Sequence, residues 1–111
     1  EGTLVVSGTI INTGTKIGKH CIINTSCSID HDNKFSDFSS AAPGVITGGN
    51  VEVGHQSFLG LGSVVRHDVK ILENTIVGLG SLVIKDCKKN LIYFGSPAKK
   101  IRTRKYNEDY M

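Results

Sequence analysis

One histidine of this chain lies between two carboxylates. Residues 28–40 read SIDHDNKFSDFSS, so that His31 is flanked by Asp30 and Asp32. A neutral imidazole can remove a proton from an attacking hydroxyl or amine, and a neighbouring carboxylate can orient the ring and stabilise its protonated form. Histidine and aspartate also bind metal ions, and a lone histidine at a turn is most often a surface residue. Three interpretations are therefore open for His31: catalytic base, metal ligand or solvated side chain.

A repeat of six residues indicates which elements position this histidine. Every sixth residue from Val5 to Val83 is large and apolar in twelve of fourteen cases, the exceptions being Ala41 and Thr47, and the residue two places earlier is always small or β-branched. A helix has a period of 3.6 residues and a plain strand alternates with a period of two, so neither explains the repeat. Short strands joined by corners, winding as a parallel β-helix, do explain it. Three hexads per coil give about 4.7 coils, stacked roughly 4.8 Å apart.

This stacking gives His31 two neighbours. Residue i lies below residue i+18, so His31, Gly49 and His67 form one column at an outward corner. A glycine above the histidine leaves space and an accessible N–H, which could face the oxyanion that develops in acyl transfer. His31 and His67 would lie roughly 10 Å apart, which is too far to share one ion. We therefore expect no metal.

Composition limits the remaining function classes. With 111 residues the chain has room for one domain. The net charge is +3, and eight of the thirteen basic residues lie between positions 85 and 105, but the aromatic content of 6% provides no stacking pattern for nucleic acid. No apolar run reaches the roughly 20 residues of a membrane span. Three cysteines without a CxxC motif favour a reduced, cytoplasmic protein.

Five motifs resemble the sugar acetyltransferases of the sialic-acid O-acetyltransferase (NeuD/PglD-like) family. They are IINTSCSIDHD (22–32), APGVITGGNVEVG (42–54), FLGLGSVV (58–65), IVGLGSLVIKD (76–86) and FGSPAKKI (94–101). The resemblance covers about three quarters of the chain, and the order of the motifs is more specific than any one of them. It implies an all-β fold, a left-handed parallel β-helix of hexapeptide repeats over residues 1–90, with a short extension over residues 91–111. It also implies a homotrimer with sites between subunits.

The resemblance further implies roles for individual residues. His31 corresponds to the general base with Asp32 beside it, and the N–H of Gly49 to the donor that meets the thioester carbonyl. Asn24 and Ser40 correspond to positions near the acceptor. Acetyl-CoA, the acyl donor, would contact a further set of residues: Gly49, Leu61, Leu79, Pro97, Lys99, Lys100 and, by its charge, Arg102.

Two departures from the family pattern stand out. Ser40 occupies the position of a second histidine that usually contacts the cofactor or the acetyl group, and Asn33, Phe35 and Ser36 replace the usual cysteine, isoleucine and glycine. Members of the family often carry an N-terminal nucleotide-binding domain, which is not in this sequence and could be missing upstream.

The function predicted from the sequence is transfer of acetyl from acetyl-CoA to an amino group of a nucleotide-linked amino sugar. Direct transfer is expected, because Cys21 and Cys27 fall in the inward column and are better core residues than nucleophiles. One alternative is O-acetylation of a sialic-acid-like sugar. A second is a non-catalytic structural or regulatory β-helix, and a metal enzyme resembling γ-carbonic anhydrase is a distant third.

Overall fold

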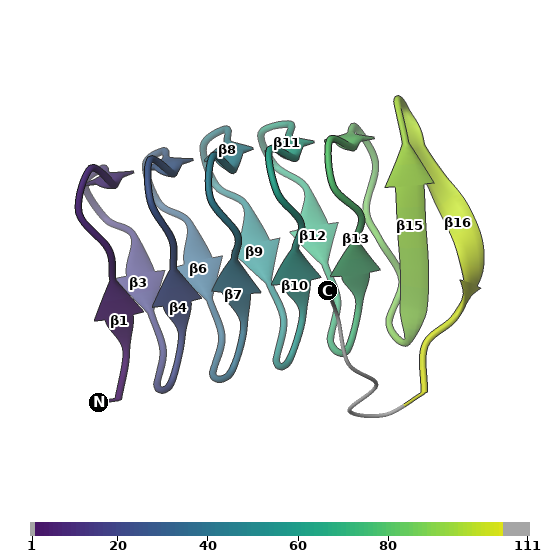
Figure 1. Ribbon diagram of the computed structural model, residues 1–111, viewed down its shortest axis with the longest axis horizontal. Helices are drawn as coiled ribbons and strands as arrows, with labels where there is room; N and C mark the ends of the chain where they lie inside the picture. The colour runs from purple at the N-terminus through teal and green to yellow at the C-terminus, as the bar shows by residue number, and fades with distance from the viewer. Residues whose placement is uncertain (1, 106–111) are drawn as a thin grey trace.

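The computed structural model describes residues 2–105, and every regular element in that range is a β-strand (Figure 1). Fourteen strands have two residues each. They are β1 (Leu4–Val5), β2 (Ile10–Ile11), β3 (Lys16–Ile17), β4 (Ile22–Ile23), β5 (Ser28–Ile29), β6 (Lys34–Phe35), β7 (Ser40–Ala41), β8 (Ile46–Thr47), β9 (Glu52–Val53), β10 (Phe58–Leu59), β11 (Val64–Val65), β12 (Lys70–Ile71), β13 (Ile76–Val77) and β14 (Leu82–Val83). Two longer strands follow, β15 (Leu91–Gly95) and β16 (Ala98–Thr103). In the described range no helix is long and apolar enough to cross a membrane.

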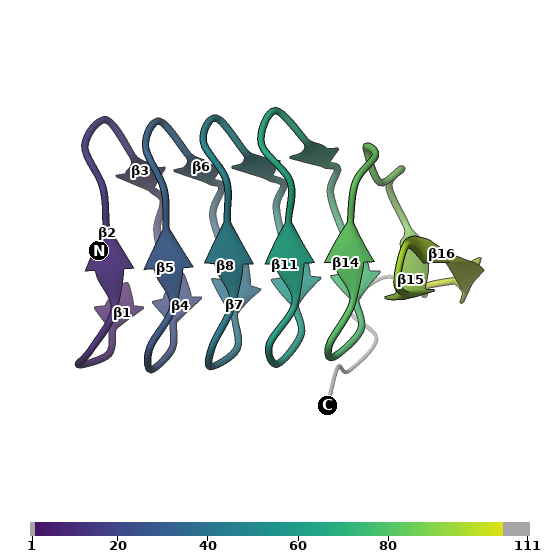
Figure 2. The same ribbon diagram turned by 90° about the horizontal axis from the view of Figure 1, so that it is seen from above.

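The strands form three sheets that run along the molecule. The first sheet has the order β1-β4-β7-β10-β13-β15-β16, the second β14-β11-β8-β5-β2 and the third β12-β9-β6-β3. Figure 2 shows the second sheet face-on. The two-residue strands of each sheet pair in parallel at an offset of eighteen residues, as in Ile23↔Ala41 and Ala41↔Leu59. The predicted all-β, left-handed parallel β-helix is confirmed, and its register passes unbroken through Ala41 and Thr47.

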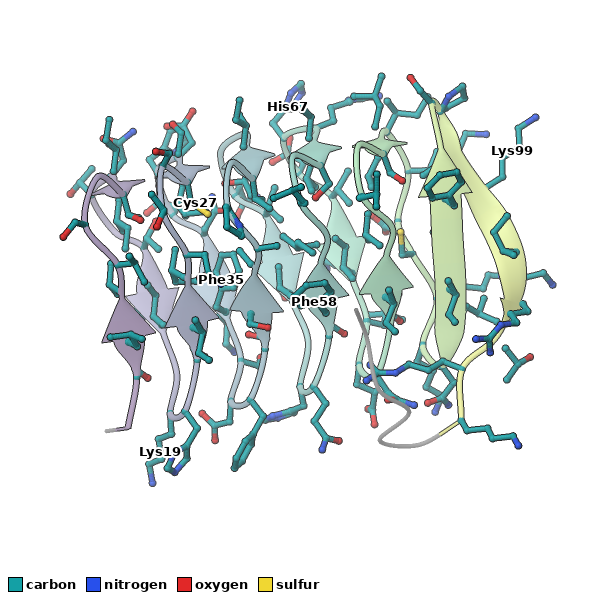
Figure 3. All side chains as sticks on the ribbon, in the orientation of Figure 1. Lys19, Cys27, Phe35, Phe58, His67 and Lys99 are labelled. Carbon is teal, nitrogen blue, oxygen red and sulfur yellow. The ribbon has the colours of Figure 1, made fainter. Side chains whose placement is uncertain are left out.

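The two inward columns make different contributions to the interior. The large column forms the apolar core, in which Phe35 is the largest fully buried side chain (Figure 3). Members of the small column use a side-chain donor to reach the backbone carbonyl fifteen residues later. Thr15 does so at Asp30 (2.8 Å) and Ser57 at Leu72 (2.6 Å). Such residues therefore satisfy corner carbonyls of the next coil that the strand ladders leave unpaired.

The outward faces of the three sheets differ in polarity. On the first and second sheets the outward residues are mainly apolar, including Leu4, Ile22, Ile10, Ile46 and Val64, all exposed. On the third sheet the outward column is charged and consists of Lys16, Lys34, Glu52 and Lys70, also exposed. Two apolar faces thus flank the corner between the first and second sheets.

The end of the helix is closed by a hairpin of the two long strands. β15 continues the first sheet in parallel with β13, and β16 returns antiparallel to β15. Tyr93 and Ala98 pack against the core, so the hairpin covers the last coil (Figure 1). These strands lie in the predicted extension over residues 91–111, of which residues 106–111 lie outside the described residues.

Candidate active site

The corner between the second and third sheets carries His31. Three backbone hydrogen bonds stack this corner coil on coil: Asp32 N–H to Thr13 O (3.0 Å), Asn50 N–H to His31 O (2.9 Å) and Asp68 N–H to Gly49 O (2.9 Å). They confirm the column predicted from the repeat, in which His31, Gly49 and His67 follow one another. The side chain of His67 projects outward from this corner in Figure 3.

The imidazole of His31 is oriented by a carboxylate. Nδ1 lies 3.0 Å from Oδ2 of Asp32, while the backbone N–H of His31 donates to Oδ1 of Asp30 at 2.7 Å. The hydrogen bond to Asp32 raises the pKa of His31 above its ordinary value of 6.5; desolvation opposes the rise, and the charges of Asp30, Asp32 and Asp68 add to it. The Nδ1 atom is thereby occupied, and Nε2 is the nitrogen left to exchange a proton with a ligand.

Gly49 lies directly against this free side of the ring. A Cβ atom on Gly49 would contact Nε2 of His31 and would lie 2.6 Å from Cε1, closer than real Cβ contacts allow. Gly49 is buried, and within residues 2–105 its N–H donates to no acceptor. The corner therefore places a proton acceptor beside an unpaired backbone donor, the pair of groups that acyl transfer requires.

A second set of predicted residues lines a groove on the first sheet and its corner with the second. Asn24, Leu61 and Leu79 border this groove, which has a volume of about 640 Å³. Its other lining residues are mostly apolar: Ala42, Pro43, Phe58, Gly60, Ile76, Val77, Gly78, Ile92, Phe94 and Arg102. Leu61 and Leu79 are eighteen residues apart in one column, so they form a ridge parallel to the helix axis.

The remaining predicted binding residues do not line this groove. Ser40 is buried in β7, where it pairs with Ile22 and Phe58. Pro97 lies between β15 and β16, and Lys99 and Lys100 are exposed on β16. Lys99 pairs with Phe94, which lines the groove, and cross-strand partners share one side of a sheet. Of the basic residues named from the sequence, Arg102 is the one that borders the groove.

His31 and the groove occupy opposite edges of the second sheet. Asn24 begins the corner before β5, and His31 lies in the corner after it. Neither His31 nor Gly49 lines the groove. One chain therefore presents two separated half-sites.

The cysteines are not placed for nucleophilic chemistry. Cys21, Cys27 and Cys87 are free and buried. Burial raises the pKa of the Cys27 thiol and raises that of Cys87 to about 12. Such thiols remain protonated near neutral pH and are poor nucleophiles. In the described part of the chain, no group of three or more His, Cys, Asp or Glu residues could hold a metal ion.

Three contributors to the site were not predicted from the sequence. Asp30 binds the backbone of His31, Phe94 borders the groove, and Asn33 contacts the backbone of the His31 corner from inside the coil. Asn33 was noted only as a departure from the family pattern. The side chain of Asn33 is longer than those of the threonines, serines and cysteines in its column, and this difference was the signal that could have identified it.

Comparison with known proteins shows that the chain is similar to acetyltransferases. No protein-family profile matches the chain. A chloramphenicol acetyltransferase from Klebsiella aerogenes is 36% identical over 72 residues, which are 65% of this chain and 34% of that protein. A histidine variant of perosamine N-acetyltransferase from Caulobacter crescentus, solved with CoA and GDP-perosamine, is 30% identical with a TM-score of 0.81. The match covers 90% of this chain and 53% of that one.

A third likeness concerns the fold alone. AntD, an N-acyltransferase from Bacillus cereus, superposes with a TM-score of 0.86 over 93% of this chain and 70% of its own, at 19% identity. The chain spans about a third of the length of the chloramphenicol acetyltransferase and about half that of the perosamine enzyme. Repeat, fold and likenesses agree: the chain is a left-handed parallel β-helix of hexapeptide repeats that is similar to these acetyltransferases.

Proposed function

We propose that the chain transfers acetyl from acetyl-CoA to an amino group of a nucleotide-linked amino sugar. The observation that carries the proposal is the His31 corner, where an imidazole bound to Asp32 lies against Gly49, a buried residue whose N–H donates to no acceptor within residues 2–105. The likeness to an enzyme solved with CoA and GDP-perosamine supports this choice of donor and acceptor. The NeuD/PglD-like resemblance agrees with it.

The two groups account for the steps of direct transfer. The acceptor amine attacks the thioester carbonyl, and Nε2 of His31 removes a proton from the nitrogen as the C–N bond forms. The carbonyl oxygen becomes an oxyanion and accepts a hydrogen bond from the N–H of Gly49. When the tetrahedral intermediate collapses, the C–S bond breaks and the CoA thiolate takes the proton from the imidazolium. Asp32 stabilises the imidazolium between these steps.

The groove on the first sheet is suited to the acyl donor. Leu61 and Leu79 offer an apolar ridge for the pantetheine arm, and Phe94 extends it toward the hairpin. Arg102 borders the groove, and Lys99 and Lys100 lie on the same strand, so that their charges would meet the phosphates of the nucleotide end. Pro97, at the turn of the hairpin, is assigned to the same end of the donor. Asn24 and Ser40 are assigned to the acceptor side.

The separation of the two half-sites supports a homotrimer. If the groove of one copy faces the His31 corner of a neighbour, each interface completes one site. The apolar outward faces of the first and second sheets would then be buried between copies, and the charged third sheet would face water. Residues such as Ile46 and Val64, exposed in the single chain, gain a partner in this arrangement.

Release of free CoA thiol tests the proposal. Acetyl-CoA would be mixed with the protein and either nucleotide-linked amino sugars or sialic-acid-like sugars, for the native chain, His31→Ala and the control His55→Ala, another exposed histidine at a different corner. We expect turnover with amino sugars, a loss of at least about a hundredfold in His31→Ala and none in His55→Ala. Turnover only with hydroxyl acceptors would assign O-acetylation instead. Binding of CoA without turnover would assign a non-catalytic role.

A further inference from the structure

Asn33 connects the two coils that carry the proposed catalytic groups. Its side chain is 1% exposed, and Nδ2 lies 2.9 Å from the carbonyl oxygen of Gly48, 3.1 Å from that of His31 and 3.2 Å from that of Asp30. Only an NH₂ group can donate to carbonyl oxygens, so this environment fixes which amide atom is nitrogen. Two hydrogens serve three acceptors, and one of them is shared.

The bond to Gly48 determines the direction of the Gly49 N–H. The carbonyl of Gly48 and the N–H of Gly49 belong to one peptide unit, which is planar and trans, so the two groups point in opposite directions. Because Asn33 holds the carbonyl toward the interior of the coil, the N–H points outward, where the exposed His31 imidazole lies. A hydrogen bond accepted by the carbonyl also polarises the unit and strengthens its N–H as a donor.

We propose that Asn33 is a positioning residue for the oxyanion donor: it orients the Gly48–Gly49 peptide unit and ties it to the backbone of His31. The inference rests on the proposed function, since it gives a role to the residue that holds the proposed donor. It assigns no contact between Asn33 and a ligand.

The hydrogen bonds of Asn33 go beyond what the fold needs at this position. One coil below, at the same corner, Thr15 satisfies the Asp30 carbonyl with a hydroxyl. A threonine at position 33 could do the same for Gly48. The asparagine instead leaves its buried Oδ1 without a hydrogen-bond partner among the described residues and gains the contacts to Asp30 and His31. An unpaired buried oxygen is unfavourable for folding, which fits a residue retained for its effect on the site.

A pair of isosteric variants separates positioning from packing. Asn33→Thr keeps a donor for the Gly48 carbonyl, whereas Asn33→Val, a residue already present in this column at Val51, removes it. We expect kcat of Asn33→Val to fall about tenfold to a hundredfold with KM for acetyl-CoA nearly unchanged, and kcat of Asn33→Thr to stay within about threefold of the native value. Ser57→Ala is the matched control, because it removes a bond of the same kind at another corner.

A second measurement does not depend on turnover. The amide nitrogen shift of Gly49, read by NMR, should move in Asn33→Val and return toward the native value in Asn33→Thr, because the shift responds to hydrogen bonding at the preceding carbonyl. Equal kcat in the native chain and both variants overturns the inference while leaving the assignment of His31 intact. An unmoved Gly49 shift overturns it as well. If the native chain transfers no acetyl, the proposed function fails, and the role of Asn33 in the reaction fails with it.

Discussion

The two ring nitrogens of His31 have different environments, and this difference determines the direction of proton transfer. Nδ1 is held by Asp32 at 3.0 Å, so Nε2 is the atom beside Gly49 and the one available to the acceptor. The side chain is 56% exposed, so the carboxylates act on it through water as well as directly. A substrate that displaced this water would strengthen the same interactions.

The pH dependence of acetyl transfer should report the hydrogen bond between His31 and Asp32. A general base acts in its neutral form, and the hydrogen bond raises the pKa of His31, so the native rate should rise with pH through a pKa above 6.5. In Asp32→Asn the carboxylate charge is lost, so this limb of kcat/KM should move to lower pH, and the plateau should fall as ring orientation weakens. A pH titration of kcat/KM measures both effects. Asp37→Asn, at another corner, should leave the profile in place.

Gly49 should resist even the smallest side chain for reasons of space. Its backbone is not in the left-handed region, so alanine is conformationally acceptable, but a Cβ would lie 2.6 Å from Cε1 of His31 and the ring would have to move. Because an exposed ring can move at little cost, Gly49→Ala should fold normally and lose at least about tenfold in kcat. Circular dichroism and initial rates test the two parts. A folded variant with native kcat would show that the ring does not act from the position described.

At the scale of the elements, the hexad period predicts the fold because each position in the hexad has one environment. Large apolar residues point inward, so the positions of the strands and the stacking of Gly49 above His31 could be predicted by counting alone. The period does not predict what a side chain does inside its column. Asn33 reaches three carbonyls because its amide is longer than the hydroxyl of Thr15, and that depends on atomic geometry.

The groove could be predicted only in part, for a related reason. Leu61 and Leu79 belong to the repeat, and their common column was evident in the sequence. Phe94 and Arg102 come from the hairpin, where an antiparallel pairing with a register shift after Ile92 replaces the repeat. Sequence reasoning assigned charge to this segment but could not determine which basic residue borders the groove.

Two phenylalanines of one segment provide a test of the core. Phe35 is 1% exposed inside the coil, whereas Phe38 is 57% exposed at a corner. Phe35→Ala should lower the free energy of unfolding by about 3–5 kcal/mol, because it removes a fully buried ring and leaves a cavity. Phe38→Ala loses its stacking on His20 and should cost about 1 kcal/mol or less. Urea denaturation compares the two, and similar losses would contradict the assignment of the inward column.

At the scale of the whole molecule, the proposed assembly implies that two defective chains can restore each other. His31→Ala removes one half-site and Leu61→Glu places a charge in the other, so each variant alone should be inactive. In trimers formed by co-expression, about a quarter of the interfaces would join an intact groove to an intact His31 corner. Activity near that fraction is expected, with light scattering to verify the trimer. Co-assembled trimers without activity would show that both half-sites must come from one chain.

The backbone ladder between coils also governs how the protein should respond to heat. His31 and Gly49 lie on adjacent coils joined by the hydrogen bond from Asn50 to His31, and Asn33 adds a side-chain bond between the same two coils. Local opening that leaves the rest of a protein folded usually begins in weakly bonded segments, and these two coils are paired on both sides. Thermal inactivation and melting of the β-helix should therefore occupy the same temperature interval, so that a native-like but inactive form does not accumulate on warming.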